Sequence, residues 1–269
     1  MDETRLKQTL TAAGIPTYRY HEVIGSTNDE ALAWCDHDAV DYALVIADEQ
    51  TKGKGRFDRR WVTRPDSSLA FSLILKPTQK EIEKLALFAP LCGLAVHDAL
   101  KEGLGLDPQI KWPNDVLLER KKCCGILVEA AWTGNHLSGV VLGIGINISA
   151  GSLPPSTDQL FSPTCLEEVT RNPVDRFLIL QRVLTQIQKW RPLLGTETFF
   201  SHWQEHLAFR GEQVMIVQNE KPSIIGIEKG INPDGNLVLI LENNTEAAFE
   251  VGDVHLRPCA AASNGGKDA

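Results

Sequence analysis

The chain has 269 residues, enough to bury a core and to form one large domain or two unequal ones. Its formal net charge of −8 argues against bulk binding to nucleic acid or to anionic membranes. No segment approaches the ~18 apolar residues of a membrane span, the N-terminus has no secretory-type apolar run, and the six cysteines form no CxxC pair. We therefore expect a cytoplasmic protein with reduced thiols, and neither a membrane nor DNA as its partner.

The first quarter of the chain predicts a helix followed by two strands. Thr27 and Glu30 have the spacing of a capping box, which predicts a helix that begins within Ser26–Asn28. The apolar runs YALVIAD from Tyr42 and SLAFSLIL from Ser68 predict two strands, with a basic loop between them.

A long helix and a series of short strands are expected next. Thr78 and Glu81 form a second capping-box pattern ahead of an apolar-periodic helix, which Pro90 should kink or split. Four closely spaced β-type runs follow: QIKW, DVLLER, CGILVEAAW and LSGVVLGIGINI. Such spacing predicts a mixed or antiparallel sheet.

The second half of the chain predicts a loop and two helices. The Pro, Ser and Gly content predicts a loop over 151–164. Asn172 followed by Pro173 predicts a helix start, and the residues after it give one apolar face: Phe177, Leu180, Leu184 and Ile187. A further helix is expected over 196–208.

The character of the chain changes after Arg210. Short strands and the turn sequence NPDGN predict a small β-barrel of about 50 residues. We expect one domain over 1–209, a separate barrel over 210–258 and a frayed tail over 259–269.

Positive charge gathers on one glycine-containing loop, TKGKGRFDRRW, at 51–61. The stretch 52–64 holds six basic side chains against one acid, Asp58. Gly53 and Gly55 allow a close approach of the backbone to a ligand, and arginine forks suit phosphate or carboxylate oxygens. The stretch predicts an anion-binding loop; a solvated basic loop and a nucleic-acid site are the alternatives.

A second stretch, IKWPNDVLLERKKCCGILVE at 110–129, places polar side chains between apolar strands. Pro113 disfavours the helical region for Trp112 and fixes a turn, so that Asn114 and Asp115 can project into one site. A carboxylate there suits Mg²⁺ with a polyphosphate. An Asx turn between two strands is the alternative.

Three further signals each have a functional and a structural interpretation. Lys122 stands at the start of an apolar strand. It is either the desolvated cation of an anion-binding site or a strand-end residue whose ammonium group reaches water. GSTNDEA at 25–31 puts two hydroxyls at a helix start. They either bind a carboxylate or ureido-type group of a ligand or only cap the helix. GIGIN at 143–147 has alternating glycines, which imply close approach of a ligand or another backbone. Asn147 either reads a base edge or ends the strand in a turn.

Taken together and in chain order, these motifs resemble the biotin–protein ligase family. The series is GSTN, a Q-x-x-G-[K/R]-G-R loop that ends in Trp, KWPND, K-x-x-GILVE, GIGIN and a small β-barrel. It covers about 20 to 258, and KWPND with GILVE at this spacing is its most specific part. The resemblance implies an α+β fold, with a mixed sheet and flanking helices in a class II synthetase-like catalytic domain, followed by an SH3-like barrel.

The resemblance also implies an activity. Such ligases join biotin to ATP with Mg²⁺, release pyrophosphate, and pass the biotinyl group to one lysine of a biotin carboxyl carrier protein or domain of a carboxylase. A lipoate–protein ligase and a non-catalytic biotin-binding sensor are the alternatives. The family includes monomers and dimers, so a homodimer is a candidate assembly. Only about 20 residues precede GSTN, so we expect a ligase without the DNA-binding repressor domain of some members.

Roles follow for the residues at matching positions. The implied catalytic residues are Lys122, Arg56 and Asp115. The implied biotin contacts are Ser26, Thr27, Asn28, Gln50, Lys54, Gly55, Arg56, Lys122 and Gly125. The implied ATP contacts are Arg56, Arg59, Trp61, Lys111, Asn114, Asp115, Lys122 and Asn147, with Asp115 also as the metal ligand.

The sequence departs from the family pattern at three places. Lys54 stands where the loop often has arginine, which keeps the charge and loses the bidentate fork. Asp58 stands where the loop often has glycine, and is expected to pair with Arg59 or Arg60. Cys123-Cys124 replaces small apolar residues; two small buried side chains are expected there, with a redox-sensitive site as the minor alternative.

Overall fold

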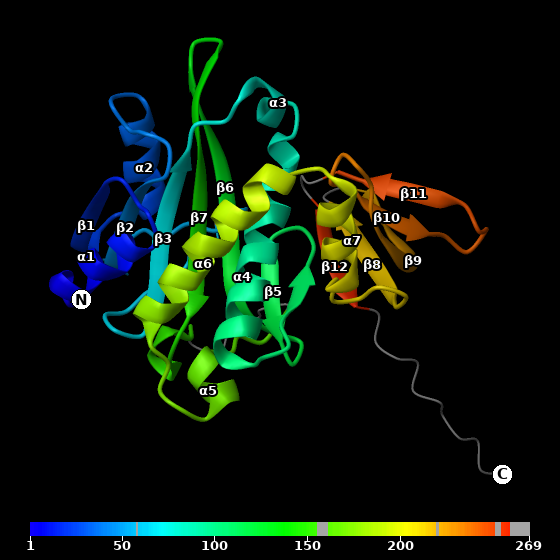
Figure 1. The fold of residues 1–269 in the computed structure, drawn as a ribbon. Coiled ribbons are helices and arrows are strands. Elements are labelled where there is room, and N and C mark those ends of the chain that lie inside the picture. Colours follow the sequence, from blue (N-terminus) through cyan, green and yellow to red (C-terminus); the bar gives the residue numbers. More distant parts are fainter. Residues whose placement is uncertain (58, 155–160, 219–220, 251–253, 259–269) are drawn as a thin grey trace. The chain divides into compact units, whose positions relative to one another are not determined.

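The computed structural model describes residues 1–57, 59–154, 161–218, 221–250 and 254–258. The chain divides into two compact units, Met1–Ala208 and Phe209–Ala269 (Figure 1). The predicted tail at 259–269, part of the predicted loop at 151–164, and Asp58 with its expected ion pair lie outside the described residues.

A seven-stranded mixed sheet organises the first unit, in the order β1-β2-β3-β7-β6-β5-β4. Its strands are β1 Tyr18–Ile24, β2 Ala43–Gln50, β3 Ser68–Leu75, β4 Gln109–Lys111, β5 Asp115–Leu118, β6 Lys121–Thr133 and β7 His136–Asn147. β1 pairs with β2 in parallel, and the other pairings are antiparallel. The predicted mixed sheet is confirmed, while β1 had not been predicted.

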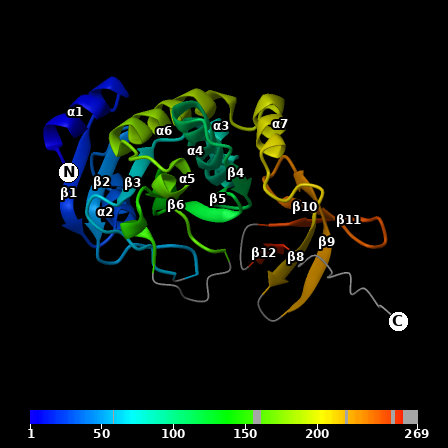
Figure 2. The ribbon, with the colours of Figure 1, turned by 90° about the horizontal axis from the view of Figure 1, so that it is seen from below.

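Helices flank this sheet, as predicted. They are α1 Glu3–Ala12, α2 Thr27–Cys35, α3 Gln79–Ile82, α4 Phe88–Leu104, α5 Leu166–Thr170, α6 Arg176–Trp190 and α7 Glu197–Glu205. α4 and α6 lie side by side over one face of the sheet (Figures 1 and 2). The apolar face predicted for α6 is buried, at Phe177, Leu180, Leu184 and Ile187. No described helix has the length and apolar character that a bilayer crossing requires.

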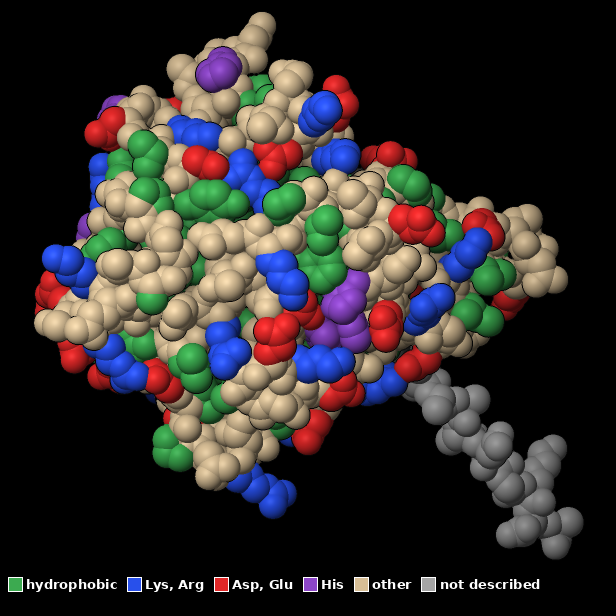
Figure 3. Space-filling view, in the orientation of Figure 1, with side chains coloured by type: hydrophobic (Ala, Val, Ile, Leu, Met, Phe, Trp, Pro, Cys, Tyr) green, Lys and Arg blue, Asp and Glu red, His purple; other side chains and the backbone are tan. Residues whose placement is uncertain are grey.

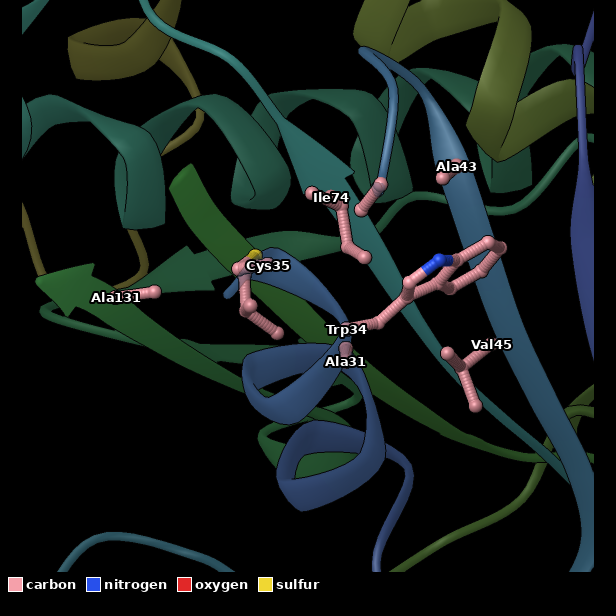
Figure 4. Close-up of a cluster of buried hydrophobic side chains, with 9 residues drawn as sticks. Ala31, Trp34, Cys35, Ala43, Val45, Ile74 and Ala131 are labelled. Carbon is pink, nitrogen blue, oxygen red and sulfur yellow. The ribbon is translucent and has the colours of Figure 1, made fainter. Parts of the chain in front are cut away.

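The opposite face of the sheet receives α2. Trp34 and Cys35 of α2 pack on Val45 and Ile74 in one buried cluster (Figure 4). Because side chains alternate along a strand, Leu44 and its alternating neighbours point to the other face, under α4 and α6. Apolar residues on both faces explain why β2 and β3 read as continuous apolar runs rather than alternating ones.

Two helix starts differ from the prediction. Ser26, not Thr27, caps α2, since the Ser26 side chain accepts from the Asp29 N–H. Thr27 Oγ1 donates instead to Gln50, and Glu30 pairs with Arg19, so neither side chain is left for a capping box.

α6 begins later than predicted, at Arg176. Its N-cap is Asp175, whose side chain accepts from the Phe177 N–H. The Asn172 side chain bonds the Thr170 carbonyl instead, so Asn172 and Pro173 lie in the turn before the helix.

The capping box at Thr78 and Glu81 is confirmed, but it opens only the short α3. The helix breaks at 83–87, before Pro90, which lies in the first turn of α4. Proline is tolerated there because the N–H groups of a first turn have no intrahelical acceptor. The prediction that Pro90 itself splits the helix is therefore wrong.

A five-stranded antiparallel sheet forms the second unit, in the order β11-β10-β9-β8-β12. Its strands are β8 Gln213–Gln218, β9 Lys221–Ile231, β10 Leu237–Ile240, β11 Glu246–Phe249 and β12 Val254–Pro258. The predicted NPDGN turn joins β9 to β10, with Asn232 Oδ1 accepting from the N–H groups of Asp234 and Asn236. This unit agrees with the predicted SH3-like barrel. β12 is a strand that had not been predicted.

Candidate active site

Glycines on neighbouring strands form the floor of the site. A Cβ on Gly143 would lie 2.2 Å from Asn28 Oδ1, and one on Gly145 would lie 2.3 Å from the Trp61 indole. Gly125 pairs with Gly145 across β6 and β7, and a Cβ there would lie 2.9 Å from the same indole. The close approach predicted from GIGIN is therefore made by side chains of the chain itself. The isoleucines between these glycines are buried on the opposite face.

A buried polar network stands at the start of α2. Thr27 donates to Gln50 Oε1 through both its backbone N and its Oγ1, at 2.8 and 3.1 Å. Ser72 Oγ lies 2.8 Å from Thr27 Oγ1 and 2.5 Å from Asn28 Oδ1. Asn28 Nδ2 donates to Glu129 Oε2 at 2.7 Å. The predicted residues Thr27, Asn28 and Gln50 thus come together. Ser72, which belongs to no motif, and Glu129, the last residue of GILVE, extend the network.

Two ammonium groups hold one carboxylate where β4, β5 and β6 meet. Lys111 Nζ lies 3.0 Å from Asp115 Oδ2, and Lys122 Nζ lies 2.5 Å from Asp115 Oδ1. Lys111 and Asp115 are buried, whereas the Lys122 side chain is 27% exposed. Burial raises the pKa of the Asp115 carboxyl, but Lys111 and Lys122 outweigh it and hold the pKa below its ordinary value. Asp115 is therefore ionised, and the group carries a net charge of about +1.

The turn before β5 connects this charge group to the basic loop. Trp112 is fully buried and anchors the turn. Asn114 Nδ2 donates to the Ile126 carbonyl at 2.7 Å, and Arg56 Nη1 approaches Asn114 Oδ1 at 3.4 Å. Asn114 thus bonds across to β6 rather than within its own turn, which differs from the hydrogen bonding of an isolated Asx turn.

The residues of the basic loop at 51–61 fall into two groups, those at the surface and those that reach the interior of the site. Lys54 forms an ion pair with Asp29 in the first turn of α2, and this hydrogen bond raises the pKa of Lys54. Both partners are about half exposed, so the pair adds little stability. Gly55 N donates to the Arg59 carbonyl at 2.7 Å, and Arg59 is exposed. Arg56 and Trp61 are the loop residues that reach the interior of the site.

Trp61 joins the loop to the floor. Its ring covers Gly145 and Gly125, and Lys122 Nζ lies 5.7 Å from the ring centroid. Its indole Nε1 is buried without a hydrogen-bond partner among the described residues, and a buried N–H of this kind favours a ligand acceptor.

Asn147 lies at the end of β7 and is buried. Its Nδ2 donates to the Thr164 carbonyl at 3.0 Å, and Thr164 N in turn donates to the Lys122 carbonyl. The amide that was predicted to read a base edge therefore bonds the chain beside Lys122.

The residues that the structure describes form no resident metal site around Asp115. Among the described residues, the one group of three or more potential metal-binding side chains is formed by three histidines and excludes Asp115. Both oxygens of Asp115 are already bound by ammonium groups. The described side chains therefore do not fit a Mg²⁺ ion held by the protein alone.

Cys123 and Cys124 are both fully buried, as predicted. Burial raises the pKa of the Cys123 thiol to about 12 and raises that of Cys124 well above its ordinary value. Thiolates are the reactive form, so the redox-sensitive interpretation has no support.

Known proteins resemble the chain both in sequence and in fold. The model of the biotin/lipoate A/B protein ligase family matches residues 20–147. The bifunctional ligase/repressor BirA of Bacillus subtilis is 30% identical over 230 residues, which are 84% of this chain and 69% of that relative. A biotin--[acetyl-CoA-carboxylase] ligase of Paracoccus denitrificans is 34% identical, over 80% of this chain and 90% of its own. The biotin protein ligase of Aquifex aeolicus, solved with biotin and ATP, has a TM-score of 0.77 at 26% identity and covers 91% of this chain and 100% of its own.

Proposed function

The chain belongs to the biotin/lipoate A/B protein ligase family, as a biotin–protein ligase, and from this premise we propose that it activates biotin with MgATP and then biotinylates a carrier protein. The observation that carries the proposal is the Lys111–Asp115–Lys122 charge group near the glycine floor that Trp61 covers. The Thr27–Gln50 network offers hydrogen-bonding groups to a ureido ring, and the ammonium groups of Lys111 and Lys122 can offset the charge of two anionic reactants.

In the first step a biotin carboxylate oxygen attacks the α-phosphorus of ATP. A carboxylate–phosphorus bond forms, the bond between the α-phosphorus and the bridging oxygen breaks, and pyrophosphate leaves. Both reactants are anions, so positive groups must offset their repulsion and stabilise the charge of the transition state. Lys122 is suited to this role because its ammonium is partly exposed beside the floor, while Asp115 fixes its position.

Biotin fits the neutral part of the site. Its uncharged thiophane ring and apolar side chain suit the surface left by Gly125 and Gly145, which carry no side chains. Thr27, Asn28 and Gln50 offer both donors and acceptors to the ureido group. Trp61 lies over the same glycines, so we expect it to move aside or to pack against bound biotin.

Substitution of Gly145 by alanine is expected to raise the KM for biotin at least 10-fold. The added methyl would lie 2.3 Å from the Trp61 indole and must displace either the ring or the strand. Steady-state pyrophosphate release at varied biotin concentrations measures the effect. Gly103→Ala is the matched control, because the nearest atoms there belong to the flexible Arg182 side chain. Equal KM values for Gly145→Ala and Gly103→Ala would contradict the biotin pocket.

Magnesium would enter this site with ATP. Because the Asp115 oxygens are engaged by lysines, the triphosphate must supply most of the ligands of the ion. The ion would neutralise part of the phosphate charge when bound. Asn114 and Asp115 stand nearest to the place proposed for the phosphates.

In the second step the Nζ of a carrier lysine attacks the acyl carbon of biotinyl-5′-adenylate. An amide bond forms, AMP leaves with the electrons of the anhydride bond, and the proton lost by the attacking amine passes to water. Asp115 is a poor acceptor for that proton, because its carboxyl pKa is held below the ordinary value by two lysines. The proposed acceptor is a biotin carboxyl carrier protein or domain, as the name of the P. denitrificans relative suggests.

Arg56→Ala is expected to release biotinyl-5′-adenylate at least 10-fold faster than the unchanged chain does. Arg56 is the loop arginine that reaches Asn114, so we propose that it holds the loop over the anhydride and helps to exclude water. Rapid gel filtration of enzyme with radiolabelled biotin and MgATP measures the retained adenylate. Arg64→Ala is the control, because Arg64 is an exposed residue of the same basic stretch. Identical retention by the two variants would remove the role given to Arg56.

A substrate panel tests the proposed function. Pyrophosphate release is followed with MgATP and, in separate reactions, biotin, lipoate or octanoate. The proposal predicts release with biotin at least 100-fold faster than with either of the others. Faster release with lipoate or octanoate would indicate a lipoate-type ligase, and no release with any acid would indicate a sensor.

A further inference from the structure

Three histidines meet at a place that the ligase reaction does not use. His97 lies on α4, His202 on α7 and His206 directly after α7, and one ring nitrogen of each lies within 4.8 Å of those of the other two. The His97 and His206 rings are stacked with their centroids 3.8 Å apart, and the His202 centroid lies 4.7 Å from that of His206. Histidine side chains gather at the surface in the region of α7 (Figure 3).

His97 has an unsatisfied nitrogen inside this group. Its side chain is fully buried, and its Nδ1 lies 2.9 Å from Asp98 Oδ1. Its Nε2 is buried with no hydrogen-bond partner among the described residues. A buried polar atom without a partner is costly, and a metal ion is one partner that an imidazole lone pair accepts.

A carboxylate stands behind two of the rings. Asp98 Oδ1 lies within hydrogen-bond distance of His97 Nδ1 and, at 3.2 Å, of His202 Nε2, and Asp98 Oδ2 accepts from Trp190 Nε1 at 2.8 Å. A carboxylate that accepts from one nitrogen of a histidine, leaving the other for an ion, is the usual support of a metal-binding imidazole.

From this geometry we propose that His97, His202 and His206 bind one Zn²⁺ ion, at a site distinct from the ligase active site. Three imidazoles with one further position match a four-coordinate zinc site, and imidazole suits zinc among divalent ions. The His202 side chain is 31% exposed, so water can take the fourth position. Nitrogens on one zinc are about 3.3 Å apart, so the rings must close by up to about 1.5 Å. A zinc ion lies in the plane of each imidazole that binds it, so the stacked His97 and His206 rings must also tilt out of their stacked arrangement.

The ion would join α7 to α4 and steady the segment beside the active site. Ile110 N donates to the His206 carbonyl, and Ala208 N donates to the Ile110 carbonyl, so this segment pairs with β4. The next residue of β4 is Lys111, which holds Asp115. The zinc is thus expected to contribute to stability and not to take part in the reaction itself.

Direct metal binding by the full chain tests the site. The protein is treated with a chelator, desalted and titrated with Zn²⁺ in competition with a chromophoric chelator. We expect one ion per chain, and a Tm about 5 °C higher when free zinc exceeds the dissociation constant 100-fold. Co²⁺ is expected to give the visible absorption bands of a four-coordinate nitrogen site. A native chain that takes up no zinc would overturn the proposal.

Matched variants locate the ion. His202→Gln with His206→Gln is expected to weaken zinc binding at least 100-fold, and Asp98→Asn about 10- to 100-fold. His37→Gln with His136→Gln removes two exposed histidines, and Cys259→Ser a cysteine; both variants are expected to bind as the native chain does. Unchanged pyrophosphate release by the His202/His206 double variant shows that it is folded. If that folded variant binds one zinc as tightly as the native chain, the site is not this one.

Discussion

Lys122→Ala is expected to slow pyrophosphate release from biotin and MgATP by about 100- to 1,000-fold while leaving the fold intact. Lys122 Nζ is the ammonium that combines partial exposure with a fixed position, 2.5 Å from Asp115 Oδ1 and 5.7 Å from the Trp61 ring centroid. Removing this ammonium group leaves the repulsion between the biotin carboxylate and the triphosphate less well screened. Stopped-flow or coupled-enzyme detection of pyrophosphate measures the rate, and circular dichroism measures the fold.

Lys121→Ala is the control for this variant. It deletes the same side chain from the adjacent residue of β6, which forms no ion pair with Asp115 among the contacts described here. We expect its rate to remain within about 3-fold of the native rate. Near-native pyrophosphate release by Lys122→Ala would remove Lys122 from the reaction and leave the charge group a structural feature.

Asp115→Asn is expected to destabilise the first unit by about 3 kcal/mol and also to reduce pyrophosphate release by about 100-fold. The substitution keeps the shape of the side chain but leaves Lys111 and Lys122 close together without their counter-charge. Urea unfolding measures the free energy, and Asp107→Asn, at an exposed aspartate, is the control.

The difference in stability between the native chain and Asp115→Asn is expected to depend on pH. The folded-state pKa of Asp115 lies below that of the unfolded chain, so its stabilisation is fully present above pH about 4 and is lost as the pH falls further. The native chain and Asp115→Asn should therefore differ most near neutral pH and converge in acid. Equal stability at pH 7 would contradict the ion-pair account of this group.

The glycine-rich strand shows how far sequence reasoning reaches into a site. Alternating glycines predict a close approach, because a strand face without side chains leaves room for another group. The sequence does not reveal which group approaches. The structure brings Asn28 to Gly143 and Trp61 to Gly145, contacts between residues more than 80 positions apart in the chain. The pairing of β6 with β7 and the docking of α2 decide these neighbours.

Two polar residues of the network received no predicted role for a similar reason. Ser72 lies in a continuous apolar run, where its hydroxyl looks incidental, yet it bonds within the network of Thr27 and Asn28. Glu129 ends the GILVE motif without a predicted role, and its carboxylate accepts from the Asn28 amide. Only the register of β3, β6 and β7 brings these side chains to the face that α2 covers.

The histidine group illustrates the same limit at longer range. His202 and His206 have the i,i+4 spacing that puts two side chains on one helical face, a signal that could have been noticed. His97 lies 105 positions before His202, and no sequence pattern links the two. The packing of α7 against α4 supplies the third ring and the carboxylate of Asp98.

The capping box predicted at Thr27 and Glu30 does not form, because other residues bind these two side chains. The Thr27 and Glu30 spacing predicts a reciprocal cap, but Gln50 and Arg19 take these two groups. The element types were predicted better than their ends, since apolar periodicity reflects burial whereas a cap depends on which partner lies nearest.

Mass spectrometry of a carrier domain tests most directly whether this cationic site brings biotin and ATP together for transfer. The chain is incubated with biotin, MgATP and a biotin carboxyl carrier domain, with Lys122→Ala in parallel. The account predicts that the native chain adds the mass of one biotinyl group at a single carrier lysine, and that Lys122→Ala adds at least 100-fold less in the same time. An unmodified carrier with the native chain, or equal modification by both chains, would contradict it.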